Sequence, residues 1–245
     1  MPRVRLDKLL VDRGLAESRQ RAAALIRAGV VLVNEVPRDK PGTQINPDAQ
    51  VRLKENPLPY VSRVGLKLEA ALDTFGVDPA GRTCADLGAS TGGFTDCLLQ
   101  RDAAKVFAVD VGYGQLAWSL RTDDRVVVME RTNARHLESL PDPVSLIVGD
   151  LSFISLSKIL PAVQRLAQPG TEAVLLIKPQ FEVGKAFVAK GGVVRDEAAR
   201  TDAIARIQQD AQELGAQVLG VMDSPVPGAK KGNIEALIHL MLQPC

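Results

Sequence analysis

The chain has 245 residues, of which 46% are hydrophobic and 24% are charged. This composition is typical of folded globular domains and excludes the disordered and fibrous classes. The N-terminus has no secretory signal and no apolar run approaches the roughly 18 residues of a membrane span, so we expect a cytoplasmic protein that does not contact membranes. The three cysteines form no C-x-x-C pair and the two histidines lie near no ligand cluster, which argues against a disulfide framework and against a metal site.

The net charge of +1 conceals an uneven distribution along the chain. Residues 1–60 hold eleven lysines and arginines against seven acidic residues, a charge of +4, and the remainder carries −3. A basic first part joined to an acidic second part predicts that the first meets a polyanion while the second does chemistry. The alternative is a solvated surface with uneven charge.

Residues 3–28 show apolar residues at helical spacing, interrupted at Gly14, which predicts two helices with Ser18 as a cap. Short β-like segments follow at 30–33 and 51–53. The run RLDKLLVDRGLAESRQRAAALIRAGVVLVNE resembles an S4 RNA-binding domain, and the resemblance implies contacts to RNA phosphates. The basic residues that we expect to make them are Arg3, Arg5, Lys8, Arg19, Arg21 and Arg27.

From residue 62 onward, short apolar runs alternate with longer amphipathic stretches. Strands are predicted near 83–86, 105–110, 126–130, 144–149, 172–178, 217–222 and 233–241. This alternation predicts a doubly wound parallel sheet, an α/β fold of the Rossmann-like type. We therefore divide the chain into an S4-like α+β domain at 1–56, a linker at 57–61 and a second domain at 62–245.

The stretch CADLGASTGGFTD at 84–96 reads as the end of a strand, a glycine turn and the start of a helix. Asp110 follows the next predicted strand, 24 positions beyond Asp86, as in a nucleotide-binding βαβ unit. The spacing fits neither a dinucleotide nor a phosphate loop, and S-adenosylmethionine fits better, with its carboxylate at the helix start and its ribose on Asp110. An ordinary βα turn is the alternative. The cofactor residues that we predict are Asp86, Gly88, Ala89, Ser90, Gly92, Gly93, Phe94, Asp110 and Asp150.

Asp150 and Lys178 also follow predicted strands directly. Each alone is as readily explained as a helix cap or a solvated tip. Ligands of open α/β sheets collect at the carboxyl ends of the strands, so together with Asp86 and Asp110 they predict a site on one rim of the sheet.

Five motifs, SRVGLKL, DLGASTGGFTD, VGDLSFISL, LIKPQFE and GNIEALI, are similar in order and context to those of the TlyA family. These are S4-containing ribosomal RNA 2′-O-methyltransferases with an FtsJ-type, class I methyltransferase domain. The resemblance implies a catalytic tetrad of Lys67, Asp150, Lys178 and Glu235, and a cytidine in 16S or 23S rRNA as the target. It also implies ribosomal subunits as partners; we expect a monomer. The linker reads LPYV where the family has Arg-x-Trp-Val.

Methyl transfer to a ribose 2′-oxygen is an in-line displacement in which the enzyme positions the oxygen and removes its proton. A lysine at the ordinary pKa of about 10.4 is protonated; burial and a second cation lower such a value, and carboxylates raise it. Our hypothesis is that Lys178 is the base, that Asp150 and Glu235 orient it, and that Lys67 positions the 2′-hydroxyl.

Two basic, glycine-flanked loops are further candidates for contacts to RNA phosphates, with Lys185 and Lys190 in the first and Lys230 and Lys231 in the second. Phe153 is either a stacking partner of a flipped base or a core residue. Two other functions compete with the enzyme: a non-catalytic RNA-binding or ribosome-assembly factor, and a cytolysin. The complete tetrad argues against the first, and the lack of a membrane span or a marked amphipathic helix argues against the second.

Overall fold

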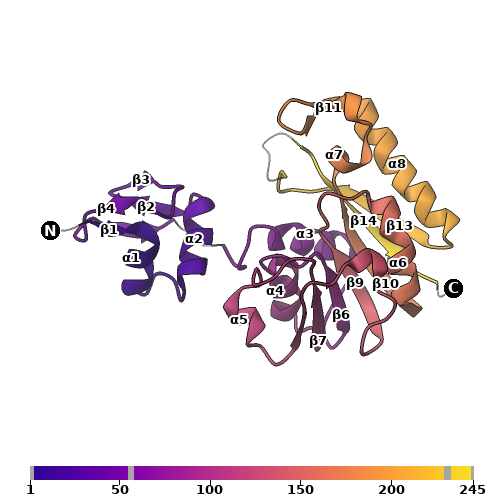
Figure 1. The fold of residues 1–245 in the computed structure, drawn as a ribbon, viewed down its shortest axis with the longest axis horizontal. Coiled ribbons are helices and arrows are strands. Elements are labelled where there is room, and N and C mark those ends of the chain that lie inside the picture. Colours follow the sequence, from indigo (N-terminus) through magenta and orange to yellow (C-terminus); the bar gives the residue numbers. More distant parts are fainter. Residues whose placement is uncertain (1–2, 55–57, 229–232, 244–245) are drawn as a thin grey trace. The chain divides into compact units, whose positions relative to one another are not determined.

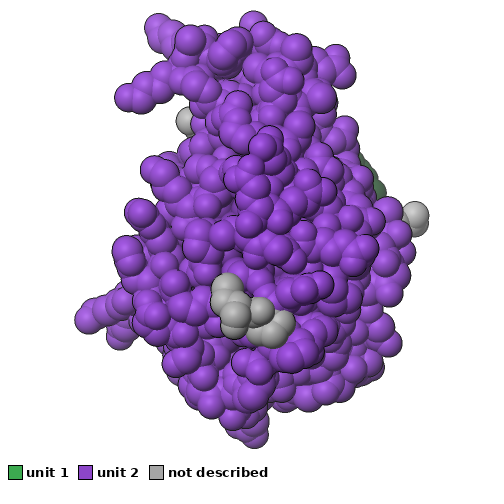
Figure 2. Space-filling view, turned by 90° about the vertical axis from the view of Figure 1, so that its right-hand side faces the viewer, with its two compact units in different colours: residues 1–63 green, residues 64–245 purple. Residues whose placement is uncertain are grey.

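The computed structural model describes residues 3–54, 58–228 and 233–243. The chain forms two compact units, residues 1–63 and 64–245 (Figure 1). Figure 2 shows the surface of the second unit. Among the described residues, no helix has the length and apolar character needed to cross a bilayer.

The first unit contains the two predicted helices, α1 (Leu6–Asp12) and α2 (Arg19–Arg27). The Ser18 side chain accepts a bond from Arg21 N at 3.1 Å, so it caps α2 as predicted. Two small sheets complete the unit: β1 (Val4–Arg5) pairs with β4 (Gln44–Ile45), and β2 (Val31–Val33) lies between β3 (Val36–Pro37) and β5 (Val51–Leu53). Strands β1, β3 and β4 were not predicted, because two residues are too few to show an alternating pattern.

A buried carboxylate holds the helices of this unit together. The Asp7 side chain accepts two bonds from Arg5, at 3.0 and 2.7 Å, and one from Arg19 at 3.2 Å. The Arg5 guanidinium, with help from Arg19, lowers the pKa of Asp7 to about 2 although burial opposes that change. Arg5 and Arg19 were predicted to contact RNA, and here they join β1 and α2 to the buried residue of α1.

A second predicted RNA contact is also used inside the unit. The Arg21 guanidinium donates to the backbone carbonyls of Leu58 and Tyr60. Both side chains are buried, so these two residues of the expected linker are fixed in the structure rather than extended and solvated.

The second unit is built on a seven-stranded sheet in the order β13-β14-β10-β9-β6-β7-β8. Its strands are β6 (Thr83–Leu87), β7 (Lys105–Val109), β8 (Val126–Met129), β9 (Val144–Gly149), β10 (Ala167–Ile177), β13 (Gln217–Asp223) and β14 (Ala236–Met241). The Rossmann-like α/β class is confirmed, but the prediction of an all-parallel sheet is wrong for β14, which runs antiparallel to β10 and β13. No helix is found between β13 and β14 in the described residues, and a parallel pairing needs such a crossover.

Helices cover both faces of this sheet (Figure 1). On one face lie α3 (Gly65–Phe75) and α4 (Gly93–Gln100); on the other lie α6 (Leu160–Leu166) and α8 (Glu197–Glu213). Leu87, Val109 and Ile147 of the strands are buried in one core with α6 and α8. Alternate residues such as Asp86 point to the opposite face, as the twofold period of a strand requires.

The short elements lie in the loops between these strands and helices. They are α5 (Trp118–Arg121), α7 (Pro179–Glu182), the hairpin β11 (Val188–Ala189) and β12 (Val193–Val194), and the 3-10 turns η1 (Ala134–His136), η2 (Leu156–Lys158) and η3 (Lys185–Phe187).

We expect Asp7→Ala to destabilise the first unit by about 1–3 kcal/mol, because two arginines lose a buried charged acceptor. The stabilisation is present above the unfolded pKa near 4 and is lost as the pH falls through about 2. Amide hydrogen exchange of α1 and α2 measures it. Asp12→Ala, an exposed acid at the end of the same helix, is the matched control. Equal exchange rates in the two variants would contradict the assignment.

Candidate active site

The glycine turn after β6 is shaped by close backbone contacts. Gly88 has a φ of +86°, and a Cβ placed there would lie 3.0 Å from the carbonyl oxygen of Asp150. A Cβ at Gly92, where φ is +99°, would clash with Leu120 and lie 2.8 Å from Leu116 Cδ1. Gly88 therefore brings the turn against the end of β9, and Gly92 admits the segment that carries α5.

Asp86 supports this turn from inside the sheet. It is fully buried, and its Oδ2 accepts bonds from Thr95 N at 2.9 Å and Thr95 Oγ1 at 2.7 Å. The residue before α4 is Gly92, which has no side chain to cap the helix. Asp86 of β6 therefore caps the helix instead. Burial raises the pKa of Asp86 to about 7, although the bonds from Thr95 oppose the change.

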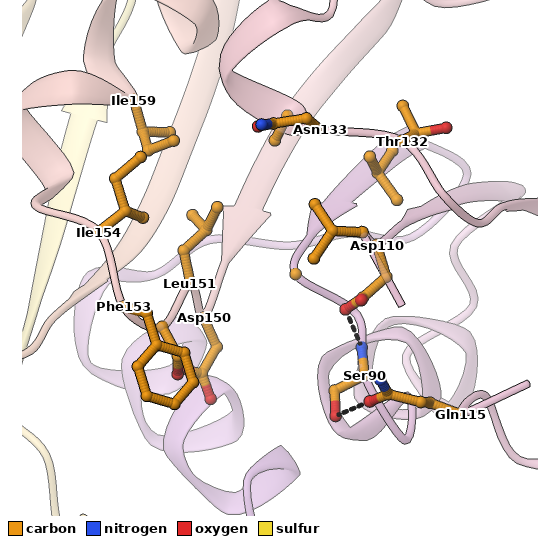
Figure 3. A pocket seen from close by; sticks show the side chains of 15 residues that line it. Ser90, Asp110, Gln115, Thr132, Asn133, Asp150, Leu151, Phe153, Ile154 and Ile159 are labelled. Atoms are coloured by element: carbon orange, nitrogen blue, oxygen red, sulfur yellow. Dashed lines mark hydrogen bonds between the residues drawn. The ribbon is translucent and has the colours of Figure 1, made fainter. Parts of the chain in front are cut away.

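A pocket of about 400 Å³ opens at the carboxyl ends of β6, β7 and β9 (Figure 3). Ser90, Asp110 and Gln115 lie together on one side of it, and Asp150, Leu151 and Phe153 lie across from them. The Asp110 carboxylate accepts from Ser90 N at 2.8 Å and from Gly112 N at 2.6 Å, and Ser90 Oγ donates to Gln115 at 3.3 Å. A carboxylate held by two backbone amides retains lone pairs for a further donor.

The predicted cofactor residues divide into two groups. Gly88, Ser90, Asp110 and Asp150 line the pocket. The pocket lining does not include the other five. Asp86 lies in β6, and the remaining four form the glycine turn and the start of α4, Ala89, Gly92, Gly93 and Phe94. The lining residues that sequence reasoning missed are Val109, Val111, Gln115, Thr132, Asn133, Ala134, Leu151, Ser152, Ile154 and Ile159. The polar stretch directly after β8 is the sequence signal from which Thr132 and Asn133 could have been predicted as lining residues.

The four candidate catalytic residues form two buried ion pairs. Lys178 pairs with Asp150, with about one tenth of each side chain exposed, and Lys67 pairs with Glu235, at 5% and 3% exposure. Four ionised groups at this depth are tolerated because each lysine meets a carboxylate. Lys178 Nζ also donates to Ser152 Oγ at 2.6 Å.

The sheet register explains why the two pairs lie at one rim. Ile177 of β10 is opposite Ala236 of the antiparallel β14, so Lys178 and Glu235 follow at neighbouring positions beyond the last paired residues. Asp150 directly follows β9, which pairs in parallel with β10. We predicted that Asp150 and Glu235 together orient Lys178; the structure pairs Asp150 with Lys178 but pairs Glu235 with Lys67.

Phe153 is not a core residue, contrary to one of our two readings. Its side chain is 92% exposed, its φ is +65°, and its ring lies 5.5 Å from that of Phe181. A bulky residue in the left-handed region is uncommon, and here its exposed ring lies among the residues that line the pocket.

The remaining candidates for RNA contacts are distributed over both units. Arg3, Lys8 and Arg27 are exposed in the first unit, and Lys185 and Lys190 are exposed in the second, around the β11–β12 hairpin. Lys230 and Lys231 lie outside the described residues. No group of three or more potential metal ligands is found in the ranges that the structure describes.

Two family models match the chain. The model "FtsJ-like methyltransferase" matches residues 60–241, and the model "S4 domain" matches residues 4–51. Together they account for most of both units.

Relatives match nearly the whole chain. The chain is 50% identical to "16S/23S rRNA (cytidine-2'-O)-methyltransferase TlyA" of Mycobacterium tuberculosis, over 98% of this chain and 91% of that protein. It is 41% identical to "Hemolysin A" of Brachyspira hyodysenteriae, over 98% and 100%. A solved structure named "Putative hemolysin from Streptococcus thermophilus" has a TM-score of 0.78 at 42% identity, and the match covers 100% of this chain and 90% of that one.

We expect stability to fall as the pH rises from about 4 to 7, because the folded chain holds a proton on Asp86 that the unfolded chain releases. Between pH 5 and 8 this group alone lowers the free energy of unfolding by about 2–3 kcal/mol. Urea unfolding across this range checks it, with Asp86→Asn, which does not titrate, as the comparison. Parallel pH profiles for the two proteins would show that Asp86 is not the titrating group.

Proposed function

This chain belongs to the TlyA family of FtsJ-like methyltransferases, and from that premise we propose that it transfers a methyl group from S-adenosylmethionine to a cytidine ribose 2′-oxygen of ribosomal RNA. The observation that carries the proposal is the pair of buried ion pairs, Lys178–Asp150 and Lys67–Glu235, at the rim of a nucleotide-sized pocket. Such a rim is where ligands of open α/β sheets bind.

The pocket has the features that S-adenosylmethionine requires. Apolar side chains suited to an adenine ring line it, Val109, Val111, Leu151, Ile154 and Ile159. Asp110 offers carboxylate oxygens to the ribose hydroxyls, and the backbone of Gly88 lines the pocket. When bound, this cofactor supplies an activated methyl group on a sulfonium sulfur.

The chain's own residues then manage the 2′-hydroxyl. Lys178 acts as the base after giving up to solvent the ammonium proton that it carries in the ion pair, and it then takes the proton of the 2′-hydroxyl as the oxygen forms its new bond to carbon. Asp150 holds the Lys178 amine at the pocket, and Lys67, kept in place by Glu235, provides positive charge for the developing oxyanion. Lys178, Asp150 and Lys67 thus keep their predicted roles. Glu235, which we predicted to orient Lys178, orients Lys67 instead.

The first unit supports the choice of substrate. It matches the S4 model and exposes Arg3, Lys8 and Arg27, which suit RNA phosphates. We assign RNA binding to this unit and methyl transfer to the second, with the boundary near residue 60. The substrate is then the ribosomal subunit, which the protein meets as a monomer in the cytoplasm.

The test is transfer of labelled methyl from S-adenosylmethionine to purified, unmodified small and large ribosomal subunits, followed by a map of 2′-O-methyl sites. We expect one defined ribose to be labelled in at least one subunit. Lys178→Ala should lower turnover by at least 100-fold and leave cofactor binding intact, because it removes the base but no part of the pocket.

The matched control is Lys105→Ala, since Lys105 pairs with Asp142 at 2.7 Å but lies at the opposite end of a strand of the same sheet. Near-normal turnover in Lys178→Ala would refute its role as base. Cofactor binding without transfer to either subunit would instead support a role in ribosome assembly.

Phe153 is placed to stack on the base of the target nucleotide, because its ring is exposed and it lines the pocket together with Asp150. We expect Phe153→Ala to reduce turnover on RNA by about 10- to 100-fold, at 1–3 kcal/mol per stacked base, and Phe153→Tyr to retain most of it. Steady-state kinetics measure this. Leu219→Ala, another exposed apolar side chain, is the control. Full activity of Phe153→Ala would exclude stacking.

A further inference from the structure

A serine two positions after Asp150 contacts the candidate base directly. Lys178 Nζ donates to Ser152 Oγ at 2.6 Å in addition to its ion pair with Asp150. A lysine ammonium has three N–H donors and an amine one lone pair, so two fixed partners define where the remaining position points. With Asp150 alone, the amine is free to rotate about a single contact.

The loop that carries Ser152 is anchored at its other end by Glu182. This carboxylate accepts from Ser155 Oγ at 2.7 Å and from Leu156 N at 2.7 Å. Glu182 is the last residue of α7, and Lys178 immediately precedes the first. The two ends of α7 therefore fix the two ends of this loop. Lys178, directly before the helix, contacts Asp150 and Ser152. Glu182, the last residue of the helix, contacts Ser155 and Leu156.

Ser152 is exposed and lines the pocket. It follows Asp150 and Leu151 and directly precedes Phe153, whose φ of +65° turns the chain. An exposed serine contributes little to core packing, so the contact to Lys178 is the interaction that its hydroxyl makes with the rest of the fold. Removing the hydroxyl should change the placement of Lys178 and leave the fold intact.

We propose that Ser152 is a positioning residue that, with Asp150, fixes the direction of the Lys178 amine at the pocket. The inference rests on the proposed methyl transfer for its kinetic consequence. Its structural basis, the Ser152–Lys178 bond, can be measured without turnover.

The kinetic arm compares Ser152→Ala, Ser152→Thr and wild type on the ribosomal subunit that wild type methylates. We expect Ser152→Ala to lower kcat about 10- to 100-fold, because misplacing a catalytic group by about 1 Å has effects of this size. The KM for RNA, the Kd for S-adenosylmethionine and the Tm stay unchanged. Ser152→Thr, which keeps the hydroxyl, restores kcat. Ser119→Ala, an exposed serine on α5, is the matched control.

The second arm labels all lysines with 13C at the ε-carbon and identifies the Lys178 signal by its loss in Lys178→Arg. In Ser152→Ala we expect this signal to shift and to show greater mobility, and in Ser152→Thr to match wild type. Wild-type kcat in Ser152→Ala would overturn the inference and leave the methyltransferase proposal standing. If wild type transfers no methyl group, the proposed function fails, and an unshifted Lys178 signal in Ser152→Ala would then overturn the positioning role as well.

Discussion

The mutual neutralisation of four buried charges is the constraint on which the second unit depends. Isolated, each lysine or carboxylate at this depth costs several kcal/mol, so each needs its partner in place. The antiparallel direction of β14 meets this requirement. Because β14 starts where β10 ends, Glu235 and Lys178 come to the same rim. A parallel β14 would begin at the opposite edge and leave Lys67 without a carboxylate there.

The cofactor pocket and the ion pairs share one loop. Asp150 lines the pocket, pairs with Lys178, and presents its carbonyl to the backbone at Gly88. The glycine turn is in turn fixed by Asp86 through Thr95. A change at Asp150 therefore affects both the cofactor pocket and the position of Lys178. This suits a reaction in which the 2′-oxygen must lie close to the methyl group and to the base.

Three basic residues of the first unit make contacts within the unit. Arg5 and Arg19 neutralise Asp7, and Arg21 holds the carbonyls of Leu58 and Tyr60. Arg3, Lys8 and Arg27 are exposed, and the side chains of Arg5 and Arg19 also keep 48% and 62% of their surface exposed. The charge excess of the first 60 residues thus serves two purposes, since part of it builds the unit and part of it is available to a polyanion.

The sequence by itself determined the α/β class and the helices of the first unit, and it marked Asp150 and Lys178, because apolar periodicity and the polar residues directly after strands are local signals. Gly88, Ser90, Asp110 and Asp150 were found in the same way. Lys67 and Glu235 were implied only by the resemblance of their motifs to the TlyA family. Only the tertiary structure decided that Lys67 pairs with Glu235, 168 positions away, that Arg5 and Arg19 bind Asp7, and that Arg21 binds the carbonyls of Leu58 and Tyr60. It also decided the direction of β14 and the outward turn of Phe153. These depend on which strands and loops become neighbours, and no residue carries that information in its local pattern.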